Sequence, residues 1–117
     1  EPCALSLISK STVIVTIHAC KEKEELIYIG GLFQELICHT EKALTLAGMT
    51  VLNHPDKFPG KNPDNICNRG ISQKGVQLEV SRGLRDHSDK IAALSRAVQN
   101  SLKTFRFHET YDNHLAD

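Results

Sequence analysis

The chain has 117 residues, of which 40% are hydrophobic and 24% are charged, and its 14 basic and 14 acidic side chains leave a formal net charge of zero. This length supports one domain with a single modest core. The balanced charge gives no basic surface, and no apolar run approaches the ~20 residues that span a bilayer, so we expect neither nucleic acid nor a membrane as partner. The four cysteines contain no Cys-x-x-Cys pair, which disfavours zinc-ribbon and thioredoxin-like folds.

The first predicted elements are a helix and two apolar strands. Residues 2–9 begin with proline and carry several apolar side chains, which predicts a short helix. Residues 12–18, TVIVTIH, are rich in β-branched residues and nearly apolar on both faces, which is typical of a strand covered on both sides. The charged run KEKEE at 21–25 is predicted to be a solvated loop, and residues 26–29 a second strand that ends at Gly30-Gly31.

A helix, a short strand and a long loop follow. Apolar residues recur at helical spacing from 32 to 47, and Gly48 is a natural stop for that helix. Residues 49–52 are predicted to form a third strand. Residues 53–75 are rich in proline, glycine and asparagine, which predicts one long loop of a length that is usually functional or disordered.

The last predicted elements are a strand over 76–81 and a long helix over 84–105 with one apolar face. Helices that alternate with apolar strands indicate α/β architecture, with helices packed on a mostly parallel sheet. We therefore expect one α/β domain over residues 1–107 and a flexible polar tail over 108–117.

Two titratable residues stand at predicted strand ends, where the ligands of open α/β sheets collect, and the Gly30-Gly31 turn is placed there too. His18 could coordinate zinc or transfer protons, or it could be a core-edge histidine satisfied by one hydrogen bond. Glu79 lies inside the apolar strand VQLEV. It is either a general base or the salt-bridge partner of Arg82 or Arg85, and the residues alone leave both interpretations open.

Three arginines are expected around the strand that carries Glu79. Arg69 follows Asn68 in the long loop, and Arg82 and Arg85 follow the strand directly. Arginine forks bind carboxylates bidentately, so together these residues predict an anionic, carboxylate-bearing substrate. For any one of them, a solvated surface position is the alternative.

Three segments together resemble a known family: TVIVTIHAC, LIYIGG and GKNPDNICNRGISQKGVQLEVSRGLR are similar to the phage-type poly-γ-glutamate hydrolases. The resemblance runs from about Glu1 to the last predicted helix. It implies a zinc-carboxypeptidase-like fold, with helices on both faces of a mixed, mostly parallel sheet. It also implies hydrolysis of γ-glutamyl amide bonds in poly-γ-glutamate with one zinc ion as cofactor.

The resemblance assigns roles to individual residues of this chain. His18 matches the third zinc ligand, in a segment where Ala19 replaces the family's glycine. Glu79 matches the glutamate that acts as general base on zinc-bound water. We infer that the residues of the family's basic motifs bind the polyanionic substrate: Asn68, Arg69, Arg82 and Arg85.

The family's first two zinc ligands, a histidine and a glutamate, lie upstream of the first segment seen here, and the chain carries no substitute pair. Because catalytic zinc normally needs three protein ligands, the chain alone is expected to be inactive or weakly active. Two alternatives stay open: a non-catalytic protein that binds poly-γ-glutamate or another γ-glutamyl polyanion, and a half-domain that completes its site with another chain. A sheet without its N-terminal part is also expected to self-associate or to be marginally stable.

The chain begins with Glu1 rather than Met, for which removal of a signal peptide is one ordinary explanation. Since members of the family occur in bacteriophages and as secreted proteins of Bacillus-like bacteria, we expect a secreted or phage-encoded protein. Cys20 and Cys67 both fall in motifs that the resemblance places at the site, where they form either a disulfide or two free buried thiols.

Overall fold

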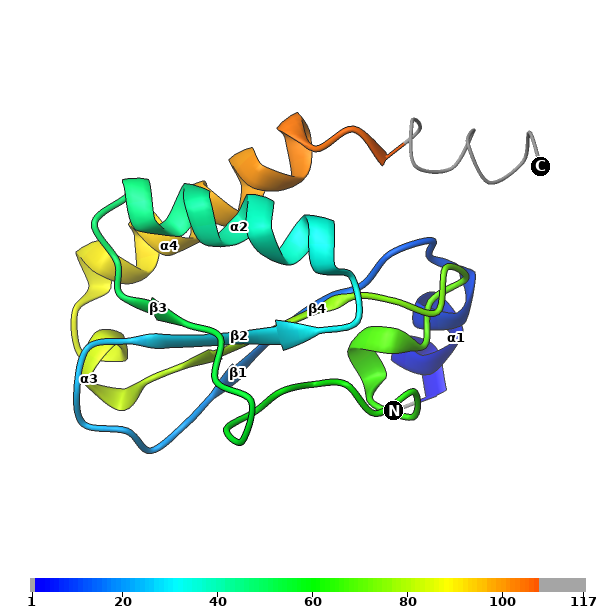
Figure 1. Ribbon diagram of the computed structural model, residues 1–117, viewed down its shortest axis with the longest axis horizontal. Helices are drawn as coiled ribbons and strands as arrows, with labels where there is room; N and C mark the ends of the chain where they lie inside the picture. The colour runs from blue at the N-terminus through cyan, green and yellow to red at the C-terminus, as the bar shows by residue number, and fades with distance from the viewer. Residues whose placement is uncertain (1, 108–117) are drawn as a thin grey trace.

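The structure, a computed structural model, describes residues 2–107 and contains one sheet of four strands in the order β1-β4-β2-β3 (Figure 1). The strands are β1 (Val15–Ala19), β2 (Ile27–Gly31), β3 (Val51–Leu52) and β4 (Val76–Val80). β1 is parallel to β4 and β2 is parallel to β3, whereas β2 and β4 are antiparallel. The prediction of a mixed, mostly parallel α/β sheet is therefore confirmed. The predicted tail at 108–117 lies outside the described residues.

Two long helices cover one face of the sheet. α2 (Gln34–Leu46) and α4 (Ser88–Thr104) pack against each other and lie together above the strands in Figure 1. They form the core with the strand side chains that point to the same face: Ile27, Ile29, Val76, Leu78 and Val80 from the sheet, and Leu36, Ile37, Leu44, Leu94 and Val98 from the helices. The other face carries the polar side chains of the strands, and neither long helix reaches it. We call it the polar face.

The helix boundaries agree only in part with those that the sequence predicts. Gly48 follows α2 with φ 87, a left-handed conformation that glycine adopts without strain, so this predicted stop is confirmed. The predicted continuous helix over 84–105 is wrong at its start, because α3 (Arg82–Arg85) ends and His87 takes an extended backbone before α4 begins. Glu25 Oε1, from a distant loop, lies 2.9 Å from His87 Nε2 and 2.6 Å from Lys90 Nζ. The spacing of apolar residues in the sequence does not reveal such contacts.

The N-terminal side of the sheet is exposed. α1 (Pro2–Lys10) contains no buried residue, and β1 pairs only with β4 within residues 2–107. Ile17 of β1 is 53% exposed, so the prediction that this strand is covered on both sides is wrong for the described residues. The predicted self-association stays a prediction.

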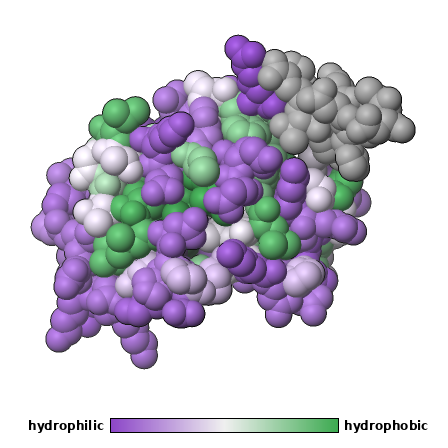
Figure 2. All heavy atoms as spheres, viewed as in Figure 1, coloured by the Kyte–Doolittle hydropathy of each residue, from purple (hydrophilic) through white to green (hydrophobic). Residues whose placement is uncertain are grey.

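None of the described helices is both long and apolar enough to cross a membrane. On the face drawn in Figure 2, hydrophobic side chains lie in separate patches between hydrophilic ones.

Candidate functional site

The polar face brings two of the predicted site residues together. Val76, Leu78 and Val80 point towards the helices, so Glu79 points the other way, as the alternation of a strand requires. In the register of the sheet, His18 of β1 is the direct neighbour of Glu79. Tyr28 of β2 is its direct neighbour on the other side. Glu79 therefore lies between an imidazole and a phenol.

Burial changes the acidity of Glu79. The residue is 8% exposed, and burial raises the pKa of its carboxyl group, an effect that the nearby His18 partly offsets by attracting the carboxylate. Within residues 2–107 the Glu79 side chain has no hydrogen bond and no ion pair. The salt-bridge alternative is therefore not what the structure shows, and the carboxylate is left available to a ligand.

The half of the polar face nearer the amino end of β4 is closed by the loop after β3. Asn65 Nδ2 donates to Gln77 Oε1 at 3.0 Å, which fixes the loop on the strand. The hydroxyl of Thr16, whose register partner is Gln77, is buried and has no hydrogen-bond partner among the described residues. In the half that carries His18 and Glu79, Phe58 of the same loop packs on Tyr28, while His18 is exposed.

Asn68 is part of the scaffold. This residue ends the short 3₁₀ helix η1 (Ile66–Asn68) and is 2% exposed. Its Oδ1 accepts hydrogen bonds from Leu32 N–H at 3.2 Å and Gly75 N–H at 3.1 Å, and its Nδ2 donates to Gly60 O at 2.7 Å and Asn62 O at 3.0 Å. The amide has no free donor hydrogen or acceptor position left. The structure therefore offers no atom for the substrate contact that the sequence predicts at Asn68.

The three arginines do not gather at one strand end. Arg69 follows η1, which lies near the start of β4. Arg82 and Arg85 instead follow the last residue of β4. A five-residue strand separates the two places by roughly 15 Å. The Gly30-Gly31 turn also lies at the far end, because β2 runs antiparallel to β4. Only Arg82 and Arg85 share an end with Glu79.

Arg85 joins the two strands of the site. Its Nη2 donates at 2.9 Å to the carbonyl of Cys20, which follows β1, and its Nε donates at 3.3 Å to the carbonyl of Val80, the last residue of β4. Arg82 is exposed, and its side chain makes no hydrogen bond or ion pair within the described range. Arg85 therefore holds the strands of His18 and Glu79 in register, while Arg82 is free to meet an anion.

This difference predicts the effect of two matched substitutions. Arg85→Ala is expected to lower the free energy of unfolding by about 1 kcal/mol, because two carbonyls lose a charged donor. It should also speed hydrogen exchange of the Cys20 amide, which donates to Val80 O at 3.0 Å. Arg82→Ala should change stability by less than about 0.5 kcal/mol. Equal effects of the two changes in urea unfolding would contradict the assignment.

A small depression beside these residues was missed by sequence reasoning. It has a volume of about 380 Å³ and is lined by residues of two loops: Cys20, Lys21, Glu22, Asp56, Lys57 and Phe58. Tyr28 links the two walls, because its hydroxyl donates to Glu22 Oε2 at 3.4 Å and its ring centroid lies 5.5 Å from that of Phe58. The tyrosine on an otherwise aliphatic strand was the signal in the sequence that could have indicated it.

The two buried cysteines lie at opposite ends of β4. Cys20 N–H bonds to the last residue of the strand, whereas Cys67 lies beside Gly75, just before the first. This separation excludes a disulfide between them, which needs Cα atoms within about 7 Å, and none of the four cysteines, which all lie among the described residues, forms a disulfide. Burial raises the pKa of the Cys67 thiol to about 11.

Alkylation without reductant tests this arrangement. In the folded protein the exposed Cys3 and Cys38 should react first, and Cys67 at least about tenfold more slowly, because its thiol is buried and protonated at neutral pH. Intact mass after denaturation should show four labels. Two labels instead of four would reveal a disulfide and contradict this arrangement.

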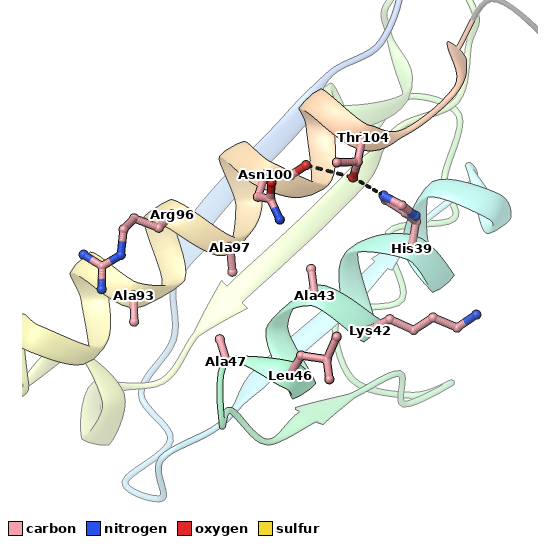
Figure 3. Close-up of a pocket in the computed structure, with 10 residues that line it drawn as sticks. All are labelled: His39, Lys42, Ala43, Leu46, Ala47, Ala93, Arg96, Ala97, Asn100 and Thr104. Atoms are coloured by element: carbon pink, nitrogen blue, oxygen red, sulfur yellow. Dashed lines mark hydrogen bonds between the residues drawn. The ribbon is translucent and has the colours of Figure 1, made fainter.

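A larger groove lies between α2 and α4 and is remote from this chemistry. It has a volume of about 730 Å³ and its floor is formed by alanines of both helices (Figure 3). His39 Nε2 and Thr104 Oγ1 lie 2.8 Å apart at one end of it. The groove is on the helical side of the sheet, opposite to Glu79, so we do not assign it to the site.

The described residues do not complete a metal centre. No group of three or more histidine, cysteine, aspartate or glutamate side chains within residues 2–107 is arranged to hold a metal ion. His18 and Glu79 offer one imidazole and one carboxylate, and the carboxylate is the predicted base. A catalytic zinc site with its usual three protein ligands is therefore not formed by these residues.

Comparison with known proteins gives the evolutionary context. The sequence matches the family model for poly-gamma-glutamate hydrolase over residues 1–111. It is 29% identical over 112 residues to the protein YndL of Bacillus subtilis strain 168, covering 93% of this chain and 44% of YndL. It is 31% identical over 83 residues to the SPbeta prophage-derived protein YoqZ of the same organism, covering 69% of this chain and 30% of YoqZ. The chain thus spans less than half the length of these curated relatives.

Solved structures show the same fold. A bacteriophage poly-gamma-glutamate hydrolase superposes with a TM-score of 0.83 at 28% identity, covering 88% of this chain and 57% of the phage chain. A zinc-free apo form of YndL superposes with a TM-score of 0.80 at 22% identity, covering 89% of this chain and 59% of that one. Because the family model matches nearly the whole sequence, the chain belongs to the poly-gamma-glutamate hydrolase family.

Proposed function

We propose that the polar face binds poly-γ-glutamate and that Glu79 is the general base of a γ-glutamyl hydrolase site. The observation that carries this proposal is the state of Glu79. Its carboxylate is buried, its pKa is raised, and it has no protein partner other than the attraction of the adjacent His18. A general base that works near neutral pH needs a raised pKa and a free carboxylate, and a structural glutamate needs neither.

The role of each residue follows from its place on this face. Glu79 would accept the proton of the attacking water, and Arg82 would attract the polyanion from the open strand end. Arg85 would keep the strands of His18 and Glu79 in register. Arg69 is too far from Glu79 to contact the same γ-glutamyl unit, although it remains a candidate contact for a more distant part of the polymer.

Turnover needs more than these residues provide. The family's zinc would supply a Lewis acid, and His18 is the described residue proposed to ligate it, but one histidine does not hold a catalytic zinc ion usefully. We therefore propose that this chain alone binds the polymer with little or no hydrolysis. We also propose that the protein is secreted or phage-encoded.

Two measurements on the purified chain test the function. Elemental analysis should find far less than one zinc per chain, and the viscosity of a poly-γ-glutamate solution should fall slowly or not at all. Polymer binding should be present in the wild type and in Glu79→Gln. Stoichiometric zinc with rapid viscosity loss that Glu79→Gln abolishes would instead identify a complete enzyme. Absence of polymer binding by the wild type would reject the proposal.

A further inference from the structure

The depression beside Tyr28 is lined by two lysines, Lys21 and Lys57, and by two acidic residues, Glu22 and Asp56. Lys21 follows β1 directly, and Lys57 lies in the loop after β3, on the opposite wall. Neither lysine forms an ion pair within residues 2–107, although Lys57 Nζ lies 5.8 Å from the centroid of the Tyr28 ring. Glu22 provides a carboxylate in the same lining that accepts from the Tyr28 hydroxyl. The depression therefore combines two lysines that form no ion pair with two carboxylates, of which that of Glu22 is oriented by Tyr28.

The wall that carries Lys57 is held in place on the sheet. Pro59 O accepts a hydrogen bond from Gly31 N–H at 2.8 Å. Gly30 permits this approach, because a Cβ there would lie 2.4 Å from the same oxygen. Phe58 has φ 51, which bulky residues rarely adopt, and it packs on Tyr28. The hydrogen bond of Pro59 and the packing of Phe58 together place Lys57 at the depression.

We propose that this depression binds one γ-glutamyl unit of the polymer next to Glu79, a subsite that rests on the proposed function. Lys57 and Lys21 bind the α-carboxylate of that unit, and Glu22 accepts a hydrogen bond from its amide N–H. In γ-linked glutamate both groups are bonded to the same carbon atom, so a cation and an acceptor on facing walls match them. In α-linked polyglutamate the carboxylate is separated from the amide by a flexible side chain.

The dimensions and position of the depression agree with this ligand. Its volume of about 380 Å³ falls in the range of small-molecule sites. Tyr28, which connects its walls, is the cross-strand neighbour of Glu79, so a unit bound there places an adjacent amide bond beside the base. The rest of the ligand can continue towards the exposed His18 of β1.

The test is calorimetric titration of the full chain with a short γ-linked glutamate oligomer, without added metal. Lys57→Gln and Lys21→Gln should each weaken binding by about fivefold to tenfold, and the double change by more. Lys61→Gln, an exposed position further along the same loop and outside the depression, is the matched control and should leave affinity within about twofold. An α-linked oligomer of equal length should bind at least about tenfold more weakly than the γ-linked one.

The outcomes separate this subsite from the wider function. If the wild type binds the γ-linked oligomer and both lysine variants bind it equally well, the subsite is wrong while the proposed function stands. Equal affinity for the α-linked and γ-linked oligomers would also overturn the subsite. No binding by the wild type would overturn both. Unchanged melting temperatures of the exposed-lysine variants establish that a loss of affinity is not a loss of folding.

Discussion

Replacing Glu79 by glutamine is expected to make the protein more stable at neutral pH while it removes the proposed base. The pKa of Glu79 is raised in the folded state, so the folded protein holds this proton more tightly than the unfolded chain does. The stability gained from this tighter proton binding is present below the ordinary pKa of glutamate. It is lost as the pH rises through the raised pKa of Glu79. Glutamine avoids this loss, which predicts that Glu79→Gln is more stable than the wild type at pH 8 and that the difference nearly vanishes at pH 4.

Urea unfolding at the two pH values measures this difference. Glu25→Gln is the control with the opposite sign, because a hydrogen bond from Lys90 lowers the pKa of Glu25, so that its stabilisation is present at pH 8 and fades as pH falls. A general base contributes about 100-fold or more to rate, so any hydrolysis by the wild type should fall by at least that factor in Glu79→Gln. A loss of stability at pH 8 would show that Glu79 is a paired structural carboxylate.

Removing the side chain of Asn68 should have the largest effect on folding. Asn68→Ala leaves two backbone N–H groups and two carbonyls without their partner, and all four of these contacts are buried or partly buried. We expect a loss of about 3 kcal/mol, a large share of the stability of a small domain. Denaturant unfolding followed by circular dichroism measures it.

Asn62→Ala is the matched control in the same loop. Its side chain makes one exposed hydrogen bond, from Asp64 N–H at 2.9 Å, and should contribute less than about 0.5 kcal/mol. If Asn68→Ala left stability unchanged and weakened polymer binding, Asn68 would be a substrate contact, as the sequence alone had predicted.

The elements with strong local signals could be predicted from the sequence. The β-branched run of β1, the alternation in β4 and the glycine after α2 each depend on neighbours in the chain, and the structure contains all three. The break at His87 could not be predicted, because Glu25, which holds the start of α4, comes from a loop more than 60 residues earlier. Strand direction is also a tertiary property, and for that reason Gly30-Gly31 was placed at the wrong end.

The candidate site could be predicted where it depends on local strand patterns, but not where it depends on contacts that form only in the fold. His18 and Glu79 stand at the ends of strands with clear patterns, and parallel pairing makes them neighbours. Asn68, by contrast, has the sequence context of an exposed loop amide, and only the folded loop shows that the backbone uses all of its hydrogen-bonding capacity. Lys57 and Lys21 belong to polar loops, which the sequence alone predicts to be solvated. They line one depression only because the loop after β3 folds back over β2.

The most direct test of the central claim is to map where a γ-linked glutamate oligomer binds to the isotopically labelled chain by NMR chemical-shift changes. The account predicts that the largest changes lie on the polar face, at His18, Glu79 and Tyr28 and in the loops that carry Lys21 and Lys57. Changes confined to the groove between α2 and α4, or no changes at saturating oligomer, would contradict it.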